Sequence, residues 1–210
     1  MRLQSLLAAS ILSVLPPSIE ESRVAQQRSA AISTPAPIRS SLPMEKSLAS
    51  FDDAAAARRW STSSDAVMGG VSTSRARIDD DGHLVFSGVV RLENNGGFAT
   101  VSGTAASRSG DDLTGYTRIA MRLKGDGKTY QLWLYTGERR RVHVARFTTT
   151  ANSWETVVIP FGAFRAENGF GLPVIAPALV DPTVLGYRLL ISDKQKGPFE
   201  LQVDWIRAVE

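Results

Sequence analysis

The chain has no cysteine and only two histidines among its 210 residues. Without cysteine there is no disulfide, no thiol nucleophile, no cysteine-ligated zinc site and no iron–sulfur cluster. Two histidines, His83 and His143, are too few for a histidine-rich metal site. We therefore expect no catalytic metal and no cofactor.

The chain also lacks a strong excess of charge of one sign. Its formal net charge is +3, and the first 43 residues hold +2 of this, from four arginines and two glutamates. The remaining residues are close to neutral, at +1. A dedicated nucleic-acid-binding domain concentrates positive charge on its folded surface. We therefore expect no nucleic-acid partner.

No apolar run is long enough to cross a membrane. The segment Leu3 to Leu15 is interrupted by polar residues and ends at Pro16-Pro17, so it is too short and too polar for a transmembrane helix. It follows Arg2 and resembles the charged start and apolar middle of a signal peptide, although no small-x-small cleavage site follows at once. Residues 18–43 are rich in serine, alanine, proline and glutamine, which is typical of a linker.

Three interpretations of residues 1–43 stay open: an export signal with a disordered linker, an organelle transit segment, or an extension before a functional start at Met44. The first implies an exported or periplasmic protein, and the last a cytoplasmic or membrane-peripheral one. The absence of cysteine does not separate them. Residues 48–208 remain as one domain, which is long enough to bury a full core.

The sequence predicts little helix and many strands. Only Phe51 to Trp60, with its alanine run, favours a helical turn or two, capped by Asp52 or Asp53. Apolar and polar residues then alternate as in half-buried strands, and glycine-rich turns separate the segments. Residues 107–115 and 162–183 are predicted loops. The predicted strands cover 84–92, 98–102, 119–124, 130–135, 141–149, 154–161, 185–192 and 199–206.

About eight such strands favour an all-β fold, an antiparallel β-sandwich of the jelly-roll kind, with a closed barrel as the alternative. No enzyme chemistry is apparent in this pattern. There is no Gly-x-Ser-x-Gly elbow, and Asp193 and Asp204 are carboxylates near strand ends with nothing to pair them. The Gly125-Asp126-Gly127 triplet lies between two strands, so it predicts a turn rather than a dinucleotide site.

Acidic residues cluster only in predicted turns, at Asp52-Asp53, Asp79 to Asp81 and Asp111-Asp112. Solvated turn acids are the simpler interpretation of all three. A structural Ca²⁺ held by oxygen ligands from Asp79 to Asp81 or from Asp111-Asp112 is the alternative.

Two glycine-rich corners, Met68-Gly69-Gly70 and Asn94-Asn95-Gly96-Gly97, are the strongest candidates for a binding surface. Exposed backbone, side-chain amides and a nearby aromatic ring can recognise a sugar or an extended peptide. The alternative is that the glycines shape corners of the sandwich and the asparagines cap them. The candidate surface comprises Asp65, Met68, Gly69, Gly70, Asn94, Asn95, Gly96, Gly97, Trp133, Asp193, Lys194 and Gln195.

Seven segments, taken in order, resemble a known family. They are Trp60; Asp65-Ala66-Val67-Met68-Gly69-Gly70-Val71-Ser72; Phe86-Ser87-Gly88; Glu93 to Phe98; Lys124 to Tyr130; Trp154 with Ile159-Pro160-Phe161; and Ser192 to Phe199. The chain is similar over residues 48–208 to the NADH:ubiquinone oxidoreductase intermediate-associated proteins, the complex I assembly-factor family named for a thirty-kilodalton protein. The resemblance implies a galactose-binding-like jelly roll without catalytic residues.

The same resemblance implies a chaperone-like role and a protein partner, namely respiratory complex I subunits or intermediates. The chain looks like a short, single-domain, bacterial version of the family. A carbohydrate-binding module is the alternative, because Trp133, Asn94 and Asn95 lie near the glycine-rich corners and suit a glycan.

Overall fold

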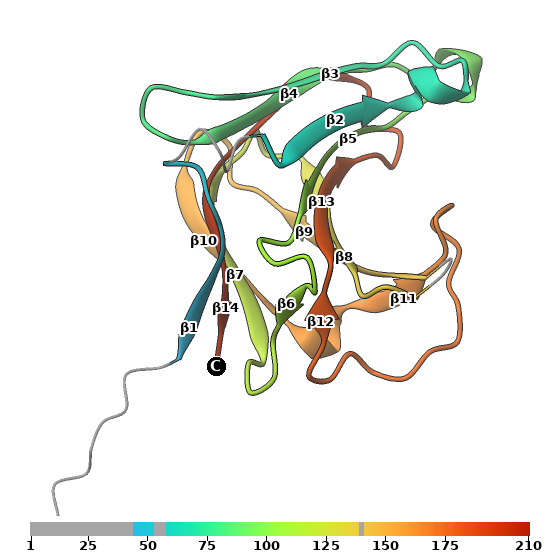
Figure 1. The fold of residues 1–210 in the computed structure, drawn as a ribbon. Helices are drawn as coiled ribbons and strands as arrows, with labels where there is room; N and C mark the ends of the chain where they lie inside the picture. Colours follow the sequence, from blue (N-terminus) through green and yellow to red (C-terminus); the bar gives the residue numbers. More distant parts are fainter. Residues whose placement is uncertain (1–43, 53–57, 139–140) are drawn as a thin grey trace, which may run out of the picture. The chain divides into compact units, whose positions relative to one another are not determined.

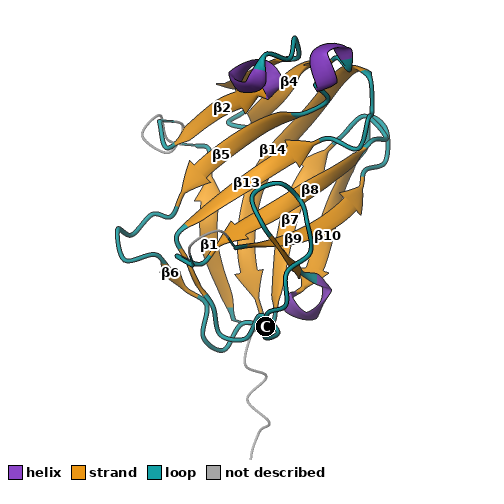
Figure 2. Ribbon diagram, turned by 90° about the vertical axis from the view of Figure 1, so that its right-hand side faces the viewer, coloured by secondary structure: helices purple, strands orange, loops and turns teal. Residues whose placement is uncertain are grey.

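The computed structural model describes residues 44–52, 58–138 and 141–210 (Figure 1). The expectations for residues 1–43 fall outside these ranges, and so does the alanine run of the expected helix at 53–57. The described residues form two antiparallel sheets that face each other, with helix limited to short 3-10 turns (Figure 2). The predicted antiparallel β-sandwich is therefore confirmed, and the two sheets do not close into a barrel.

The first sheet is organised around one long strand, β14, which pairs with β7 along one edge. Along the other edge β14 pairs with β4 through its first half and with β1 through its second half. In the sheet order the strands are β10 (Trp154–Pro160), β7 (Arg118–Lys124), β14 (Gly197–Val209), β4 (Leu84–Val90) and β3 (Thr73–Ile78), with β1 (Glu45–Ser50) beside β14.

The second sheet carries the surface on which the candidate site lies. A separate two-stranded pair, β6 (Asp111–Asp112) with β12 (Thr183–Val184), lies outside both sheets. In order, the second sheet comprises β11 (Arg165–Glu167), β9 (Val142–Thr148), β8 (Thr129–Tyr135), β13 (Gly186–Ile191), β5 (Ala99–Thr104) and β2 (Trp60–Ser64).

The core fills the space between the sheets and follows the predicted alternation. On β7, Ile119, Met121 and Leu123 are fully buried, while Arg122 between them is exposed. Side chains on a strand alternate between its two faces, so one face supplies the core and the other meets solvent or another element. Buried residues from both sheets form one continuous apolar cluster.

Six strands were not predicted from the sequence: β1, β2 and β3, and the short strands β6, β11 and β12. β2 has the sequence Trp-Ser-Thr-Ser-Ser and β3 is Thr-Ser-Arg-Ala-Arg-Ile; both lie at sheet edges and are largely polar. The expected helix is wrong at its end, because Trp60 begins β2. The predicted loops also contain short strands, since β6 lies within 107–115 and β11 within 162–183.

Helical structure consists of η1 (Asp65–Met68), η2 (Glu93–Asn95) and η3 (Phe161–Ala163), each a short 3-10 turn. In the described ranges no helix is long and apolar enough to span a membrane. η1 follows β2 and η2 precedes β5, and the two turns lie beside each other at one end of the sandwich (Figures 1 and 2).

Candidate functional site

Asp65 joins the two glycine-rich corners that the sequence singled out. It is only 1% exposed. Its Oδ1 accepts the backbone N–H of Ser72 at 2.9 Å, and its Oδ2 accepts those of Gly97 at 2.6 Å and Phe98 at 3.2 Å. The hydroxyl of Ser72 also donates to Oδ2. Burial opposes ionisation, but these hydrogen bonds outweigh it and hold the pKa of Asp65 below its usual value.

The glycines of both corners leave room for this carboxylate. A Cβ on Gly70 would lie 2.2 Å from Oδ1 of Asp65, and one on Gly96 would lie 2.7 Å from Oδ2. Gly69 ends η1 in the left-handed conformation, with φ of 88°, and its carbonyl accepts a hydrogen bond from Nδ2 of Asn94 at 3.0 Å. These contacts give Asp65, Gly70 and Gly96 a packing role at this corner.

The turn after β13 is held by another of the predicted residues. Asp193 and Lys194 both have φ of 59°. Gln195 then donates from Nε2 to the carbonyl of Thr129 at 2.7 Å and accepts the N–H of Thr129 at 3.0 Å. The side-chain amide of Gln195 therefore bonds both backbone groups of Thr129, as a residue of a paired strand would, and connects this turn to the start of β8.

A groove lies on the face of the second sheet that points away from the core. We call it the sheet groove; its volume is about 410 Å³. Met68 approaches it from the β2 edge, and the loop after β11 approaches it from the opposite edge. It is lined by Met68, Phe98, Thr100, Gln131, Trp133, Arg146, Glu167, Gly169, Phe170, Gly171, Arg188, Leu190, Ser192 and Asp193.

A connected polar network forms the floor of the sheet groove. The indole N–H of Trp133 donates to Oε1 of Gln131 at 2.8 Å, and Nε2 of Gln131 donates to Asp193 at 3.2 Å. The guanidinium of Arg188 lies 5.3 Å from the ring centre of Trp133 and the same distance from that of Tyr135. Together with the apolar cluster of Val142, Val144 and Leu190, this stacking leaves Trp133 only 5% exposed, so its ring is part of the floor and is largely covered.

The second charged pair of the groove joins β9 to β11. Arg146 donates from Nη1 to Oε1 of Glu167 at 2.9 Å. The Glu167 side chain is 5% exposed, whereas that of Arg146 is 45% exposed. Among the described residues, Oε2 of Glu167 is buried and has no hydrogen-bond partner. A buried carboxylate oxygen without a donor is energetically costly, which makes it the most unusual polar atom of the groove.

Three of the predicted surface residues, Met68, Trp133 and Asp193, meet in the sheet groove. The others form the Asp65 corner or the turn after β13. Gln131, Arg146, Glu167 and Arg188 were not predicted to belong to the site. Arg188 could have been predicted as a site residue, because it is a cation inside an otherwise apolar strand. The Arg146–Glu167 pair could not, because it depends on the register of β11 against β9, which the sequence pattern does not determine.

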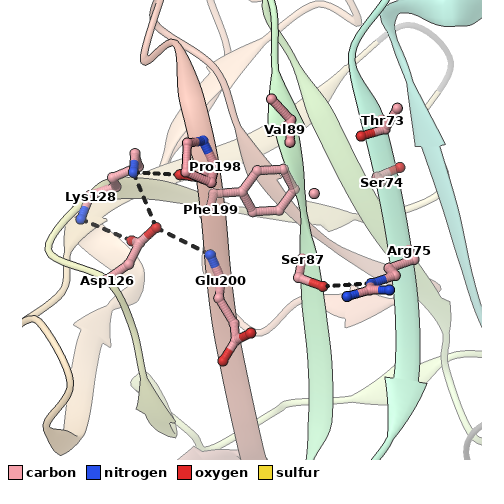
Figure 3. Close-up of a pocket in the computed structure, with 11 residues that line it drawn as sticks. Thr73, Ser74, Arg75, Ser87, Val89, Asp126, Lys128, Pro198, Phe199 and Glu200 are labelled. Carbon is pink, nitrogen blue, oxygen red and sulfur yellow. Dashed lines mark hydrogen bonds and ion pairs between the residues drawn. The ribbon is translucent and has the colours of Figure 1, made fainter.

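A second hollow, of about 660 Å³, lies on the outer face of the first sheet, over β3, β4 and β14 (Figure 3). Its polar groups already bind one another. Lys128 contacts Asp126 at 3.3 Å and the carbonyl of Pro198 at 2.7 Å, and Arg75 donates to Ser87 at 3.2 Å. No residue of the predicted surface lines it, so we place the candidate site in the sheet groove.

Most of the other acids that the sequence singled out form ion pairs or hydrogen bonds within the described structure. Asp204, on the first sheet, pairs with Arg122 at 3.0 Å, whereas Asp193 follows β13 of the second sheet. The side chains of Asp79, Asp81 and His83 gather at the turn before β4, where Asp79 accepts the N–H groups of His83 at 2.8 Å and Asp81 at 3.2 Å. These bonds account for the cluster as a turn cap.

The other two acids offered for calcium are also hydrogen-bonded. Asp111 accepts the hydroxyl of Tyr187 at 2.7 Å, and Asp112 accepts the N–H of Thr114 at 3.0 Å. His143 is 4% exposed on β9, so it is a buried strand residue. In the sheet groove, the described residues offer amide, guanidinium and carboxylate groups for recognition. None of these groups is a nucleophile placed next to a base.

A family model described as "Complex I intermediate-associated protein 30 (CIA30)" matches residues 49–203. The chain is 24% identical over 173 residues to "Complex I intermediate-associated protein 30, mitochondrial" of Drosophila melanogaster. That similarity covers 70% of this chain and 57% of the relative, so the chain spans less than two thirds of the relative's length.

The structure is similar to the family 11 carbohydrate-binding module of the cellulosomal cellulase Lic26A-Cel5E of Clostridium thermocellum, with a TM-score of 0.60 and 17% identity over 80% of this chain and 96% of the module. It is also similar to an agarase, AgWH50C, with a TM-score of 0.56 and 10% identity over 79% of this chain and 24% of the agarase. At these identities the likeness concerns the fold alone. It confirms the galactose-binding-like jelly roll.

Proposed function

The chain belongs to the complex I intermediate-associated protein 30 family, and on this premise we propose that it is a non-catalytic, protein-binding factor that assists assembly of respiratory complex I. The observation that carries the proposal is the family match over residues 49–203, which takes in strands of both sheets and every residue of the sheet groove. The partner is then a complex I subunit or a partly assembled intermediate.

The groove supports a binding role of this kind. Its charged groups are already arranged in pairs and stacks, as in the Arg146 to Glu167 contact at 2.9 Å. Catalysis by acid–base chemistry needs a titratable group held within reach of a reacting atom, usually beside a second such group. The described lining residues provide recognition groups at fixed positions instead, which suits the binding of another molecule.

The test is the fate of complex I in cells that lack the gene. We expect less assembled complex I on native gels, accumulation of a membrane-arm intermediate, and recovery when the full chain is restored. The tagged full chain, purified from native membranes, should bring complex I subunits with it. Normal complex I in the deletion strain, together with no complex I subunit in the purified sample, would overturn the proposal.

Binding of a glycan is the second candidate. The observation that favours it is Phe170, an aromatic ring that is 88% exposed at the rim of the sheet groove. A sugar ring packs its C–H groups against an open aromatic face, and Trp133 does not offer one because Arg188 lies over it. A glycan array, with soluble mixed-linkage glucan as an additional probe, tests this candidate; signals at background level exclude it.

A further inference from the structure

Exposed apolar side chains are concentrated in two segments, each of which contributes one of them to the lining of the sheet groove. Among the described residues, seven of the ten exposed large apolar side chains belong to two segments. One segment is η1 and the residues that follow it, and the other is the loop from Asn168 to Val180, which carries no charged residue. The seven are Val67, Met68, Val71, Phe170, Leu172, Ile175 and Val180.

The two segments form rims at opposite edges of the same sheet. η1 follows β2, which is one edge strand of the second sheet, and the uncharged loop follows β11, the other edge strand. Met68, 65% exposed, and Phe170, 88% exposed, both line the groove between them. Exposed apolar side chains that are gathered at a groove, rather than scattered singly over the surface, mark an interaction site.

Glu167 adds a requirement for a hydrogen-bond donor. Its side chain is 5% exposed, and Arg146 satisfies Oε1 but leaves Oε2 without a described partner. Gly171 lies over this oxygen, and even a Cβ there would be 3.7 Å from it. Gly171 therefore brings no side chain to Oε2, and a donor from a bound molecule can reach this buried oxygen only if the segment around Gly171 moves aside.

We infer that the sheet groove binds an extended polypeptide segment in which a lysine or arginine lies between apolar residues. The cation meets the free Oε2 of Glu167, and the neighbouring apolar side chains pack against Met68 and Phe170. This inference rests on the proposed function, because it specifies the protein partner of the same site.

Two observations favour a polypeptide over other occupants. A glycan can stack on Phe170 but gains little from the aliphatic side chain of Met68, whereas apolar side chains of a polypeptide can pack against both. A bilayer surface would cover the rims but would offer no hydrogen-bond donor to Oε2 of Glu167 from its apolar lipid, which is unfavourable. A charged donor satisfies that oxygen most strongly, through a charge-assisted hydrogen bond.

The experiment is selection of random twelve-residue peptides, displayed on phage, against the immobilised full chain. We expect the selected peptides to be enriched in lysine or arginine with apolar residues on both sides. A synthetic peptide from the selection, with its basic residue replaced by glutamate, should lose binding in fluorescence anisotropy. Selection that enriches no peptide, or enriches peptides without a basic residue, overturns the inference.

Variants connect the binding to the groove. Glu167→Gln should weaken the selected peptide about tenfold or more, since it removes a charge-assisted hydrogen bond. Phe170→Ser changes an exposed side chain, so it should weaken binding while leaving the melting temperature unchanged. The matched control is Glu200→Gln, which alters a carboxylate in the hollow of the other sheet and should bind as the wild type does. Equal binding by the wild type, Glu167→Gln and Phe170→Ser would overturn the inference, as would displacement of the peptide by a glycan.

The same variants separate this inference from the proposed function. If the deletion strain lacks complex I but regains it with both Glu167→Gln and Phe170→Ser, the assembly role stands and the groove inference fails. If selected peptides bind in a Glu167-dependent way but complex I is normal in the deletion strain, the groove inference stands and the assembly role fails.

Discussion

Asp65 shows how one side chain can hold together segments that are distant in sequence. Its carboxylate receives N–H groups from Ser72 and from Gly97, seven and thirty-two residues away. Gly70 and Gly96 then have to be glycine, because a Cβ at either position would collide with that carboxylate. One buried acid, Asp65, therefore explains both glycine pairs. The sequence analysis included Asp65 in the candidate surface but did not predict that the two corners pack around it.

Replacement of Gly70 by alanine tests this packing. The new Cβ would lie 2.2 Å from Oδ1 of Asp65, so either the corner must open or the carboxylate must move away from its donors. We expect the free energy of unfolding, measured by urea denaturation, to fall by about 3 kcal/mol.

Gly162→Ala is the matched control, since a Cβ at Gly162 meets nothing within 4 Å. It should change stability by no more than about 0.5 kcal/mol. Wild-type stability of Gly70→Ala would show that the corner does not depend on close contact with Asp65. A stable Gly70→Ala protein that fails in complex I assembly would indicate that this corner contacts the partner.

His143 should make stability depend on pH near neutrality. Burial, and then the positive charge of Arg141, lower the pKa of His143 in the folded protein below its ordinary value of 6.5. The unfolded chain therefore takes up this proton first as the pH falls. The free energy of unfolding should be highest above pH 6.5 and should decline as the pH drops from 6.5 towards the lower folded pKa.

Urea denaturation at a series of pH values between 7.5 and 5.5 measures this slope. His143→Gln should remove it, whatever the change in absolute stability. Arg141→Gln should reduce the slope without abolishing it, because burial is the larger cause of the lowered pKa. An unchanged slope in His143→Gln would assign the pH dependence to other groups.

At the scale of elements, β1 contributes more than its composition suggests. It pairs with the second half of β14 and places Leu48 and Ala49, each 3% exposed, in the core. Its sequence, Glu-Lys-Ser-Leu-Ala-Ser, is mostly polar and gave no strand signal. Pairing with a long strand that is already in place, rather than intrinsic preference, accounts for its structure.

Leu48→Ala should therefore be costly. Removal of a buried leucine side chain from a packed core lowers the free energy of unfolding by about 3 kcal/mol. The matched control is Leu185→Ala, because Leu185 is 41% exposed and its truncation should cost no more than about 1 kcal/mol. Equal effects of the two substitutions in thermal or urea denaturation would mean that β1 is not part of the cooperative core.

The elements that could be predicted from the sequence are those whose burial follows a local pattern. β7 and β8 alternate clearly around the Gly125–Lys128 turn, and both strands were predicted. β2 was missed because an edge strand made almost wholly of polar side chains carries no such alternation, and β3 because only Ala76 and Ile78 mark its partly buried face. The groove was only partly predicted for the same reason: Glu167 reaches Arg146 through the pairing of β11 with β9, and that register is a tertiary property.

At the scale of the whole domain, both sheets share one core. The same apolar cluster contains Leu84 and Met121 of the first sheet and Leu132 and Leu189 of the second. Neither sheet can bury its inner face without the other. We therefore expect the described domain to unfold as one cooperative unit.

Urea denaturation followed by two probes tests this cooperativity. Far-ultraviolet circular dichroism reports both sheets, and tryptophan fluorescence reports Trp60 and Trp133 of the second sheet together with Trp154 and Trp205 of the first. The two transitions should coincide, and they should still coincide in the double variant Trp60→Phe/Trp133→Phe, whose tryptophan fluorescence reports the first sheet. Separate midpoints would indicate that the sheets unfold independently.

The pairing of β1 with the end of β14 has a consequence for how this domain can be built into larger proteins. The N–H of Glu210 donates to the carbonyl of Met44 at 3.2 Å, so the first and last described residues are neighbours. A short linker could join them, with new ends opened in the exposed loop at Arg108, and every strand would keep its partners. The same closeness lets the whole sandwich be inserted into a surface loop of another polypeptide as a self-contained cassette, with its groove intact and only two neighbouring points of attachment.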